Sequence, residues 1–482
     1  MKDQSKQGLS RRQFLQIAGF GTATLALAAC AAPGAAPAPA AEGGSSAPAT
    51  DTVVLHIQMN EDDEKPVADM FKDQNSNVEF EFITVTGIDH EEVASKILSM
   101  LAAGQPLDLG FAATEATQLY AGQELAAKLD DWVNRDGGEL QDYFSDVHPS
   151  LVEAMMWQGS LYELPYDFNA ANMYYNTALF QEAGIEHPAP DWTKDDFSEI
   201  AKAITKKNTA GETDVFGFGW TNRLWGSWTP WYFVNNGNIL QEERSPGGDW
   251  LWDSFYKDDA AAEGRGGGWN WPAPKANSPE VVEALEFVQQ LTQEGIAPAI
   301  ELGGGATLQG FFTGGKLGMT PAGGFWSGGL ANAGMAADAF DVQLWPKWQS
   351  QRHQFGTGGL FVVNTQQEAS MEMAWSYMKH RVTREAMQAH AIFNPVTRTT
   401  PARRSMNTAE RYANTGPVHW EVFYSTLDDH PDTAPIPAPP VSNPMTTAYT
   451  KYTGLAMSGE MTAQEAMDGL QKELEEIFAR GV

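Results

Sequence analysis

Short apolar runs alternate with helical patterns in the chain after position 50. Runs of apolar and β-branched residues at 52–59, 78–85 and 107–111 predict three strands. Between the second and third runs, apolar residues at i, i+4, i+7 and i+8 over 93–101 predict a helix that stops at Gly104. Strands that alternate with helices indicate right-handed βαβ units. The pattern therefore predicts an α/β fold with a parallel sheet.

The second half of the chain is predicted to be mainly helical. The run 193–196 (TKDD) is typical of a capping box, and Ser278-Pro279 is a typical helix start. A second capping box at 462–465 predicts the last helix. No internal repeat with a period of 20 to 50 residues is present, which argues against a solenoid.

The N-terminal segment has the pattern of an export signal. Residues 17–29 carry no charge, but they are fewer than the ~20 residues that cross a bilayer. They end in Leu-Ala-Ala before Cys30, the only cysteine, and this resembles a bacterial lipoprotein signal. The resemblance implies cleavage before Cys30, lipid attachment at its thiol and a location outside the cytoplasm. The alternative is a buried free cysteine.

The arginine pair bears on the export route. The sequence SRRQFLQ at 10–16 resembles the twin-arginine signal, although the general secretory route remains an alternative. Residues 31–50 are nearly all Ala, Pro, Gly and Ser and are expected to form a flexible tether. We therefore divide the N-terminus into a signal peptide at 1–29 and a linker at 30–50.

Composition excludes some classes of partner. The chain has 62 acidic and 31 basic residues and a formal net charge of −31, which disfavours nucleic acid and anionic lipid headgroups. With Cys30 acylated, no thiol is left for a disulfide, a zinc cluster or a nucleophile. Many of the 16 tryptophans lie beside Gly, Asn or Pro, which favours groove-lining aromatic residues.

Several features that could indicate a phosphate-binding, metal or catalytic site do not support one. The run 310–316 is close to a phosphate-binding loop, but Leu317 stands where Ser or Thr should bind Mg²⁺. The nine histidines are scattered without paired spacing, so neither a metal site nor a cofactor is expected. Carboxylates are so abundant that any pair of them is weak evidence for acid/base catalysis.

A series of motifs carries a family resemblance. Residues 159–166 (GSLYELPY) and 173–185 (MYYNTALFQEAGI) closely follow one family pattern, and 311–319, 374–378 and 401–404 match later parts of it. In this order the motifs resemble the extracellular solute-binding proteins of ABC importers, in the branch similar to maltose-binding protein that takes up sugars. The resemblance covers most of residues 50–480.

The resemblance implies a two-lobed periplasmic-binding-protein fold with a hinge of crossing strands. By analogy, the N-terminal lobe holds 51–166 and 347–395, and the C-terminal lobe holds 167–346 and 396–482. The Gly/Trp-rich insertion at 244–277 departs from the family pattern and could reshape the ligand groove.

The implied function is capture of a sugar or oligosaccharide by a monomer, without chemistry, for delivery to the transmembrane subunits of an ABC permease. Two alternatives are a secreted glycoside hydrolase, which would need two carboxylates at a fixed separation, and a sugar sensor that feeds a receptor kinase.

A sugar site needs aromatic platforms. By the resemblance, Trp326 matches a tryptophan that stacks on sugar, against the alternative of core packing. Trp225, Trp228 and Trp231 are spaced by three, although Pro230 would disturb a helix there. Of these we expect Trp228 and Trp231 to reach the cleft, unless the segment is simply buried.

Polar ligand contacts are expected where strands end. The candidates follow the first strand, the third strand and the first and third crossings between lobes. They are Asn60, Glu61, Thr114, Glu115, Asp167 and Arg398. Glu61 and Glu115 could instead merely begin helices, and Arg398 could be one of several surface arginines.

Overall fold

Two mixed β-sheets organise the part of the chain that the structure, a computed structural model, describes: residues 52–87, 90–299, 305–365, 367–394 and 397–481. Residues 52–481 fall within one unit that starts at position 51. The expected signal peptide, the linker, Cys30 and the crossing at 395–396 lie outside the described residues.

The first sheet has the strand order β15-β6-β14-β3-β1-β2, and β16 pairs with β14. Its strands are β1 (Val53–Ile57), β2 (Val78–Phe82), β3 (Leu109–Ala113), β6 (Leu164–Ala170), β14 (Gln354–Val362), β15 (Thr400–Pro401) and β16 (Ala434–Pro435). β1 pairs in parallel with both β2 and β3, which confirms the predicted βαβ units. β14 runs antiparallel to β3 and β6.

Helices and short elements accompany this sheet in the chain. They are α2 (Glu61–Gln74), α3 (His90–Ala102), α4 (Thr114–Gly122), α5 (Asp130–Phe144), α6 (Pro149–Ala154), α14 (Glu368–Arg381) and α15 (Arg384–Ala389), with the hairpin β4 (Met156–Trp157) and β5 (Ser160–Leu161).

The second sheet has the order β13-β7-β12-β9-β8. Its strands are β7 (Asn172–Asn176), β8 (Lys206–Lys207), β9 (Thr213–Phe218), β12 (Leu317–Ala322) and β13 (Phe340–Gln343). The helical elements around it are α7 (Thr177–Glu182), α8 (Lys194–Ile204), η1 (Leu224–Trp228), α9 (Thr229–Val234), α11 (Pro279–Gln293), α12 (Gly305–Thr313) and α13 (Phe325–Asn332).

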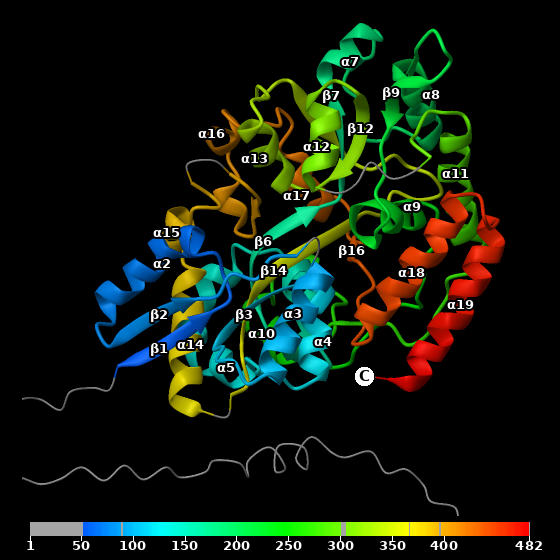
Figure 1. The fold of residues 1–482 in the computed structure, drawn as a ribbon. Coiled ribbons are helices and arrows are strands. Elements are labelled where there is room, and N and C mark those ends of the chain that lie inside the picture. The colour runs from blue at the N-terminus through cyan, green and yellow to red at the C-terminus, as the bar shows by residue number, and fades with distance from the viewer. Residues whose placement is uncertain (1–51, 88–89, 300–304, 366, 395–396, 482) are drawn as a thin grey trace, which may run out of the picture. The chain divides into compact units, whose positions relative to one another are not determined.

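The remaining C-terminal elements are η3 (Arg404–Met406), α16 (Ala409–Tyr412), α17 (Val422–Asp428), α18 (Ser442–Met457) and α19 (Ala463–Arg480). The last two helices lie side by side (Figure 1).

The chain passes between the sheets beside the central strands β6 and β14 (Figure 1). β6 stays in the first sheet through Ala170, and β7 begins the second sheet at Asn172. The first passage is therefore at Ala171, later than the expected position near 165–167. The second lies between β13 and β14, where the sequence predicts it.

Helix starts follow the predicted capping residues. Thr193 and Thr462 each accept a hydrogen bond from the third helical residue, and the acidic side chain there accepts one from the capping backbone. Pro279 occupies the first position of α11, and Gly295 after that helix has the left-handed φ of 74°. The two capping boxes and this helix are confirmed.

The insertion at 244–277 contains β10 (Glu243–Arg244), α10 (Asp249–Phe255), η2 (Ala260–Ala262) and β11 (Trp269–Asn270). It lies against α6 and the β4–β5 hairpin, which accompany the first sheet in the chain. Trp250 Nε1 donates to the carbonyl of Gly159 at 3.1 Å, and Arg265 pairs with Glu153 at 2.8 Å. The insertion, which lies in the chain between β9 and β12 of the second sheet, thus contacts α6 and the β4–β5 hairpin.

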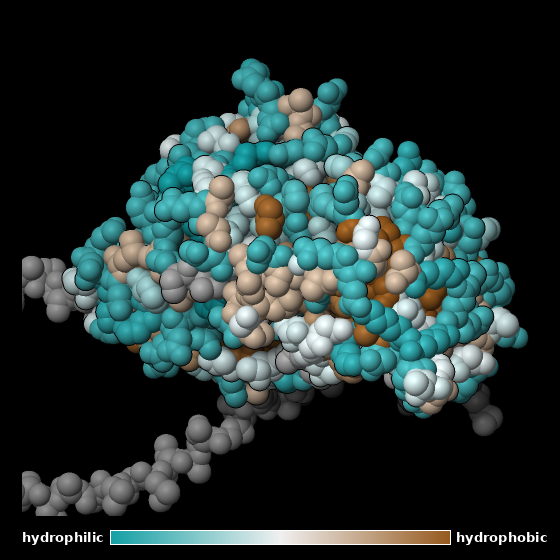
Figure 2. All heavy atoms as spheres, turned by 90° about the horizontal axis from the view of Figure 1, so that it is seen from above, coloured by the Kyte–Doolittle hydropathy of each residue, from teal (hydrophilic) through white to brown (hydrophobic). Residues whose placement is uncertain are grey.

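The described helices include none that is long and apolar enough to cross a bilayer. The face in Figure 2 is largely hydrophilic, with small apolar patches between polar side chains. This agrees with the high content of acidic residues.

Candidate functional site

A group of partly exposed aromatic and polar side chains lies where elements of the two sheets meet. We call it the inter-sheet cluster. Its members are Asp167, Asn169, Trp225, Phe325 and Thr399. All are partly exposed except Thr399, which is buried.

Hydrogen bonds connect the polar members. Thr399 Oγ1 donates to Asp167 Oδ2 at 2.9 Å and lies 3.4 Å from Asn169 Oδ1. The backbone N–H of Phe325, at the start of α13, donates to the same Asn169 oxygen at 3.2 Å. Residues of β6, of the segment before β15 and of α13 are thereby held together.

Two rings form the aromatic side of the cluster. The centroids of Trp225 and Phe325 are 5.5 Å apart, and the ring planes are tilted by 48°. The indole packs closely on backbone, because a Cβ atom added at Gly323 would lie 2.9 Å from Trp225 Cη2. A Cβ atom added at Gly356 would lie 2.8 Å from Trp225 Nε1. Glycine at both positions makes room for the indole.

A non-helical stretch of backbone separates Trp225 from the tryptophans after it. Trp225 has extended angles (φ −63°, ψ 129°), and Gly226 has a φ of 69°, which favours glycine. The N–H of Gly226 donates to Gln354 Oε1 on β14 at 2.8 Å. The indole of Trp225 is thus directed to the cluster, whereas Trp228 and Trp231 continue into the helical segment.

The predicted platforms are buried instead. The exposed fractions of Trp228, Trp231 and Trp326 are 0%, 1% and 2%. Trp326 meets the rings of Tyr174 and Phe312 edge-on, with centroids 5.7 and 5.5 Å away. In this conformation all three belong to the core, as the alternative interpretation of each allowed.

The polar candidates after the first and third strands have different positions. Asn60 and Glu61 are exposed at the start of α2, where Glu61 is one of four acidic residues in the first turn. Thr114 and Glu115 are buried at the start of α4, and Thr114 Oγ1 donates to Glu115 at 3.2 Å. Thr114 Oγ1 would lie 3.5 Å from a Cβ atom added at Gly356, so it approaches the glycine against which Trp225 packs.

One polar candidate, Asp167, belongs to the cluster, and Arg398 directly precedes the member Thr399 in the chain. Burial raises the pKa of Asp167 to about 6, although Thr399, His90 and Arg381 act in the opposite direction. The Arg398 guanidinium forms an ion pair with Asp63 of α2 and is partly exposed. It therefore links the segment before β15 to the first turn of α2.

Sequence reasoning did not select Trp225, Phe325, Asn169 or Thr399. The signal for Trp225 was the glycine after it, which interrupts the i, i+3 spacing. Among the described residues one further group has the composition of a metal site: His187, Asp341 and His419. These come from three distant segments, so their spacing gave no signal.

A family model settles the relationship. The model for the bacterial extracellular solute-binding protein family matches residues 67–417, which is most of the chain. The chain belongs to this family. A relative, a putative binding protein of Brucella abortus, is 28% identical over 151 residues. That match spans 31% of this chain and only 33%, about a third, of the relative.

Solved structures of this kind share the fold of the present solute-binding protein. One is an ABC substrate-binding protein from Listeria monocytogenes in complex with cycloalternan, with a TM-score of 0.68 and 18% identity over 89% of this chain and 99% of that one. Another is an ABC transporter solute-binding protein from Thermotoga lettingae bound to α-D-tagatose, with a TM-score of 0.68 and 16% identity over 89% and 100%. The predicted periplasmic-binding-protein fold is confirmed. The family and these structures are binding proteins, not enzymes.

Proposed function

We propose that the protein is the substrate-binding component of an ABC importer and that it holds a sugar or oligosaccharide at the inter-sheet cluster. The observation that carries the proposal is the pairing of two partly exposed rings with a carboxylate and an amide. Aromatic faces pack on the C–H surfaces of a sugar, and fixed polar groups bind its hydroxyls.

The position of the cluster supports capture by closure. Its members come from β6 of the first sheet and from η1 and α13, which accompany the second sheet, so a ligand bound there would contact both lobes and favour their approach. The proposed lobes are built on the two sheets, with the first passage at Ala171. The ligands in the titles of the similar structures, a cyclic oligosaccharide and a monosaccharide, support a carbohydrate but leave its length open.

The polar members are suited to hydroxyl recognition. Asp167 has a pKa of about 6 and is therefore mostly ionised at pH 7, where it accepts hydrogen bonds from sugar hydroxyls. The amide of Asn169 both donates and accepts, although its Oδ1 is already engaged by Phe325.

The first experiment is a thermal-shift screen of the purified chain against mono- and oligosaccharides, with calorimetric titration of each sugar that raises the midpoint. We expect one sugar bound per chain and recovery of that sugar unchanged after long incubation. A Trp225→Ala variant serves as the site control. If sugars stabilise it as strongly as the wild type, the binding site is elsewhere. Release of reducing ends in proportion to protein would contradict a binding function.

We further propose that the protein is exported, is tethered by lipid at Cys30 through the linker at 31–50, and delivers its ligand to the permease subunits. The support is the sequence pattern around the only cysteine. Cys30→Ala should abolish the acyl mass and release the protein from membranes, with unchanged sugar affinity. A mature wild-type N-terminus at another residue, without acyl mass, would refute the anchor.

A further inference from the structure

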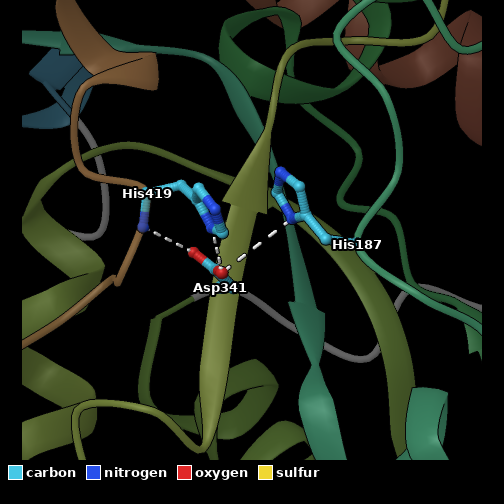
Figure 3. A group of neighbouring side chains, drawn as sticks. All are labelled: His187, Asp341 and His419. Atoms are coloured by element: carbon cyan, nitrogen blue, oxygen red, sulfur yellow. Dashed lines mark hydrogen bonds and ion pairs between the residues drawn. The ribbon is translucent and has the colours of Figure 1, made fainter.

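Three potential metal ligands meet at one edge of the second sheet, away from the inter-sheet cluster. Asp341 lies on the edge strand β13, His187 between α7 and α8, and His419 just before α17. Figure 3 shows both imidazole rings beside the strand, with dashed lines that converge on the Asp341 carboxylate. The candidate ligand atoms all lie within 4.8 Å of one another.

The same nitrogen of each ring faces the carboxylate. Nδ1 of His419 is 2.5 Å and Nδ1 of His187 is 3.9 Å from Asp341 Oδ2. Tetrahedral ligands about 2.1 Å from a zinc ion are roughly 3.4 Å apart, so the two observed distances bracket the required one. The rings are stacked, with centroids 3.8 Å apart and an interplanar angle of 14°.

The carboxylate is fixed by contacts that direct Oδ2 toward the histidines and toward the Tyr175 hydroxyl, which lies 3.3 Å from Oδ2 and 2.6 Å from His187 Nδ1. Its other oxygen, Oδ1, accepts the backbone N–H groups of Val342 and His419, each at 3.0 Å. The exposed fraction of the Asp341 side chain is 6%, against 30% for His187 and 46% for His419. A buried, oriented oxygen therefore faces two nitrogens on partly exposed rings, and an ion on His187 Nδ1 would replace the contact of that nitrogen with the Tyr175 hydroxyl.

The cluster opens on a pocket of about 370 Å³ whose lining includes both histidines. Asp191, Glu421 and Asp429 also line this pocket, so its charge favours cations. An ion held by the three ligands would keep a coordination position open to water or to a solute from the pocket.

A second histidine–carboxylate cluster in the protein contains an arginine, which the cluster at Asp341 does not. In the first sheet's core, Glu64 accepts from Arg381 at 2.7 Å and contacts His390 at 2.8 Å, and all three are at most 2% exposed. Arg381 supplies a permanent positive charge there. At Asp341 the two groups in ion-pair contact are imidazoles, which carry no permanent charge and have nitrogens that can bind a metal.

We propose that His187, Asp341 and His419 bind one divalent transition-metal ion of the zinc class through two imidazole nitrogens and one carboxylate oxygen. Imidazole and carboxylate are preferred zinc ligands, and a set of three with an open position is a recurring arrangement.

The side chain of Gln343 contacts the His187 ring on the side away from the proposed ion. Gln343 Nε2 donates to the carbonyl of Pro188 at 2.6 Å and lies 3.1 Å from His187 Nε2. A metal on Nδ1 puts the ring proton on Nε2, where an amide N–H₂ group is a poor partner and a carboxylate is a good one. The Leu344 N–H, which donates to Gln343 Oε1 at 2.8 Å, holds the amide with its nitrogen toward the ring. A carboxylate at this position would accept the ring proton, so Gln343→Glu should improve binding.

The test is calorimetric titration of ZnCl₂ into tag-free full-length chain after EDTA treatment, in a Cys30→Ser background because a free thiol binds zinc. We expect one ion per chain with a dissociation constant that rises at least about 10-fold in His187→Gln and in His419→Gln. Gln343→Glu should lower the constant by about 10-fold, the size of effect seen for partners of metal-bound histidines. Circular dichroism and the unfolding midpoint without zinc check that each variant is folded.

His430→Gln is the matched control, because His430 lines the same pocket but is not one of the three ligands. It should bind zinc like the parent. Equal zinc affinity in the parent, His187→Gln and His419→Gln would indicate an adventitious ion only on surface carboxylates and would overturn the proposal. Loss of binding in His430→Gln with retention in His419→Gln would overturn it as well.

Discussion

Trp225 and Trp231 stand six positions apart in one aromatic segment, yet they have opposite environments. Trp231 is 1% exposed and its ring meets Phe287 and Trp345 edge-on, with centroids 4.9 and 5.2 Å away. Trp225 is partly exposed and is paired with Phe325 across the inter-sheet cluster. The difference arises at Gly226, whose left-handed φ interrupts the helical path between them.

The comparison teaches that composition alone does not assign a tryptophan to a ligand site. Both residues lie beside Gly or Pro, and both are spaced by three from Trp228. What separates them is the backbone: Trp225 precedes the glycine, and Trp231 lies inside α9, which begins at Thr229. Core tryptophans hold the second sheet's helices together, whereas the cluster tryptophan is available to a solute.

The largest effect is expected on stability from Trp231→Ala. Loss of this ring from the core should lower the free energy of unfolding by roughly 3–5 kcal/mol. Among the described residues Trp231 Nε1 has no hydrogen-bond partner, so Trp231→Phe, which removes that buried N–H, should cost clearly less. Denaturant unfolding of the two variants measures this. A small loss of unfolding free energy in Trp231→Ala, accompanied by weakened sugar binding, would place Trp231 in the ligand site and contradict its contrast with Trp225.

Trp225→Ala is expected to have the opposite profile. Removing a ring that packs on ligand should cost about 1.5–3 kcal/mol of binding free energy. This corresponds to about 10- to 100-fold in affinity. Stability should change much less than in Trp231→Ala, because the ring is partly exposed. Trp225→Phe, which retains an aromatic face, is the control and should bind with intermediate affinity. Calorimetric titration beside denaturant unfolding separates the two profiles, and unchanged affinity in Trp225→Ala would contradict the assignment.

Much of the fold could be predicted from local signals. The capping residues Thr193 and Thr462 were predicted correctly because each depends on neighbouring residues alone. The parallel pairing of the first strands followed from their alternation with helices, and the two-lobed fold followed from the family resemblance. The first passage at Ala171 was missed by a few residues, because the pairing of β6 with β14 joins residues far apart in the chain.

The site was harder to predict because it depends on tertiary contacts. Asp167 was selected because it lies near an expected passage between lobes. The ring of Trp326, the predicted platform, is covered by Tyr174 and Phe312, while the residue before it in the chain, Phe325, faces the cluster. A one-residue difference at a helix start decides which of two aromatic rings is accessible, and periodicity does not resolve that.

The smallest effect should come from Asp167→Asn, which tests the carboxylate of the inter-sheet cluster. Asparagine retains the shape of the side chain but replaces a charge-assisted hydrogen bond with a neutral one. The difference is about 1 kcal/mol, or roughly 5-fold in affinity. Calorimetric titration at pH 7.5 measures this, with unfolding as the check that the core is unaffected.

The pH dependence of the same residue gives a test with a definite sign. Because the pKa of Asp167 is raised to about 6 by burial, sugar affinity of the wild type should fall as the pH drops through 6 and the carboxylate becomes protonated. The stability of the ligand-free protein should respond in the other direction. The folded state binds this proton more readily than the unfolded state, whose carboxyl has an ordinary pKa near 3.8, so this group's contribution to stability grows as the pH falls from about 6 toward 4. Asp167→Asn should lose both dependences. A variant that keeps the wild-type fall in affinity below pH 6 would show that another group titrates in the site, and the carboxylate of Asp167 would then not be the acceptor of the sugar hydroxyl.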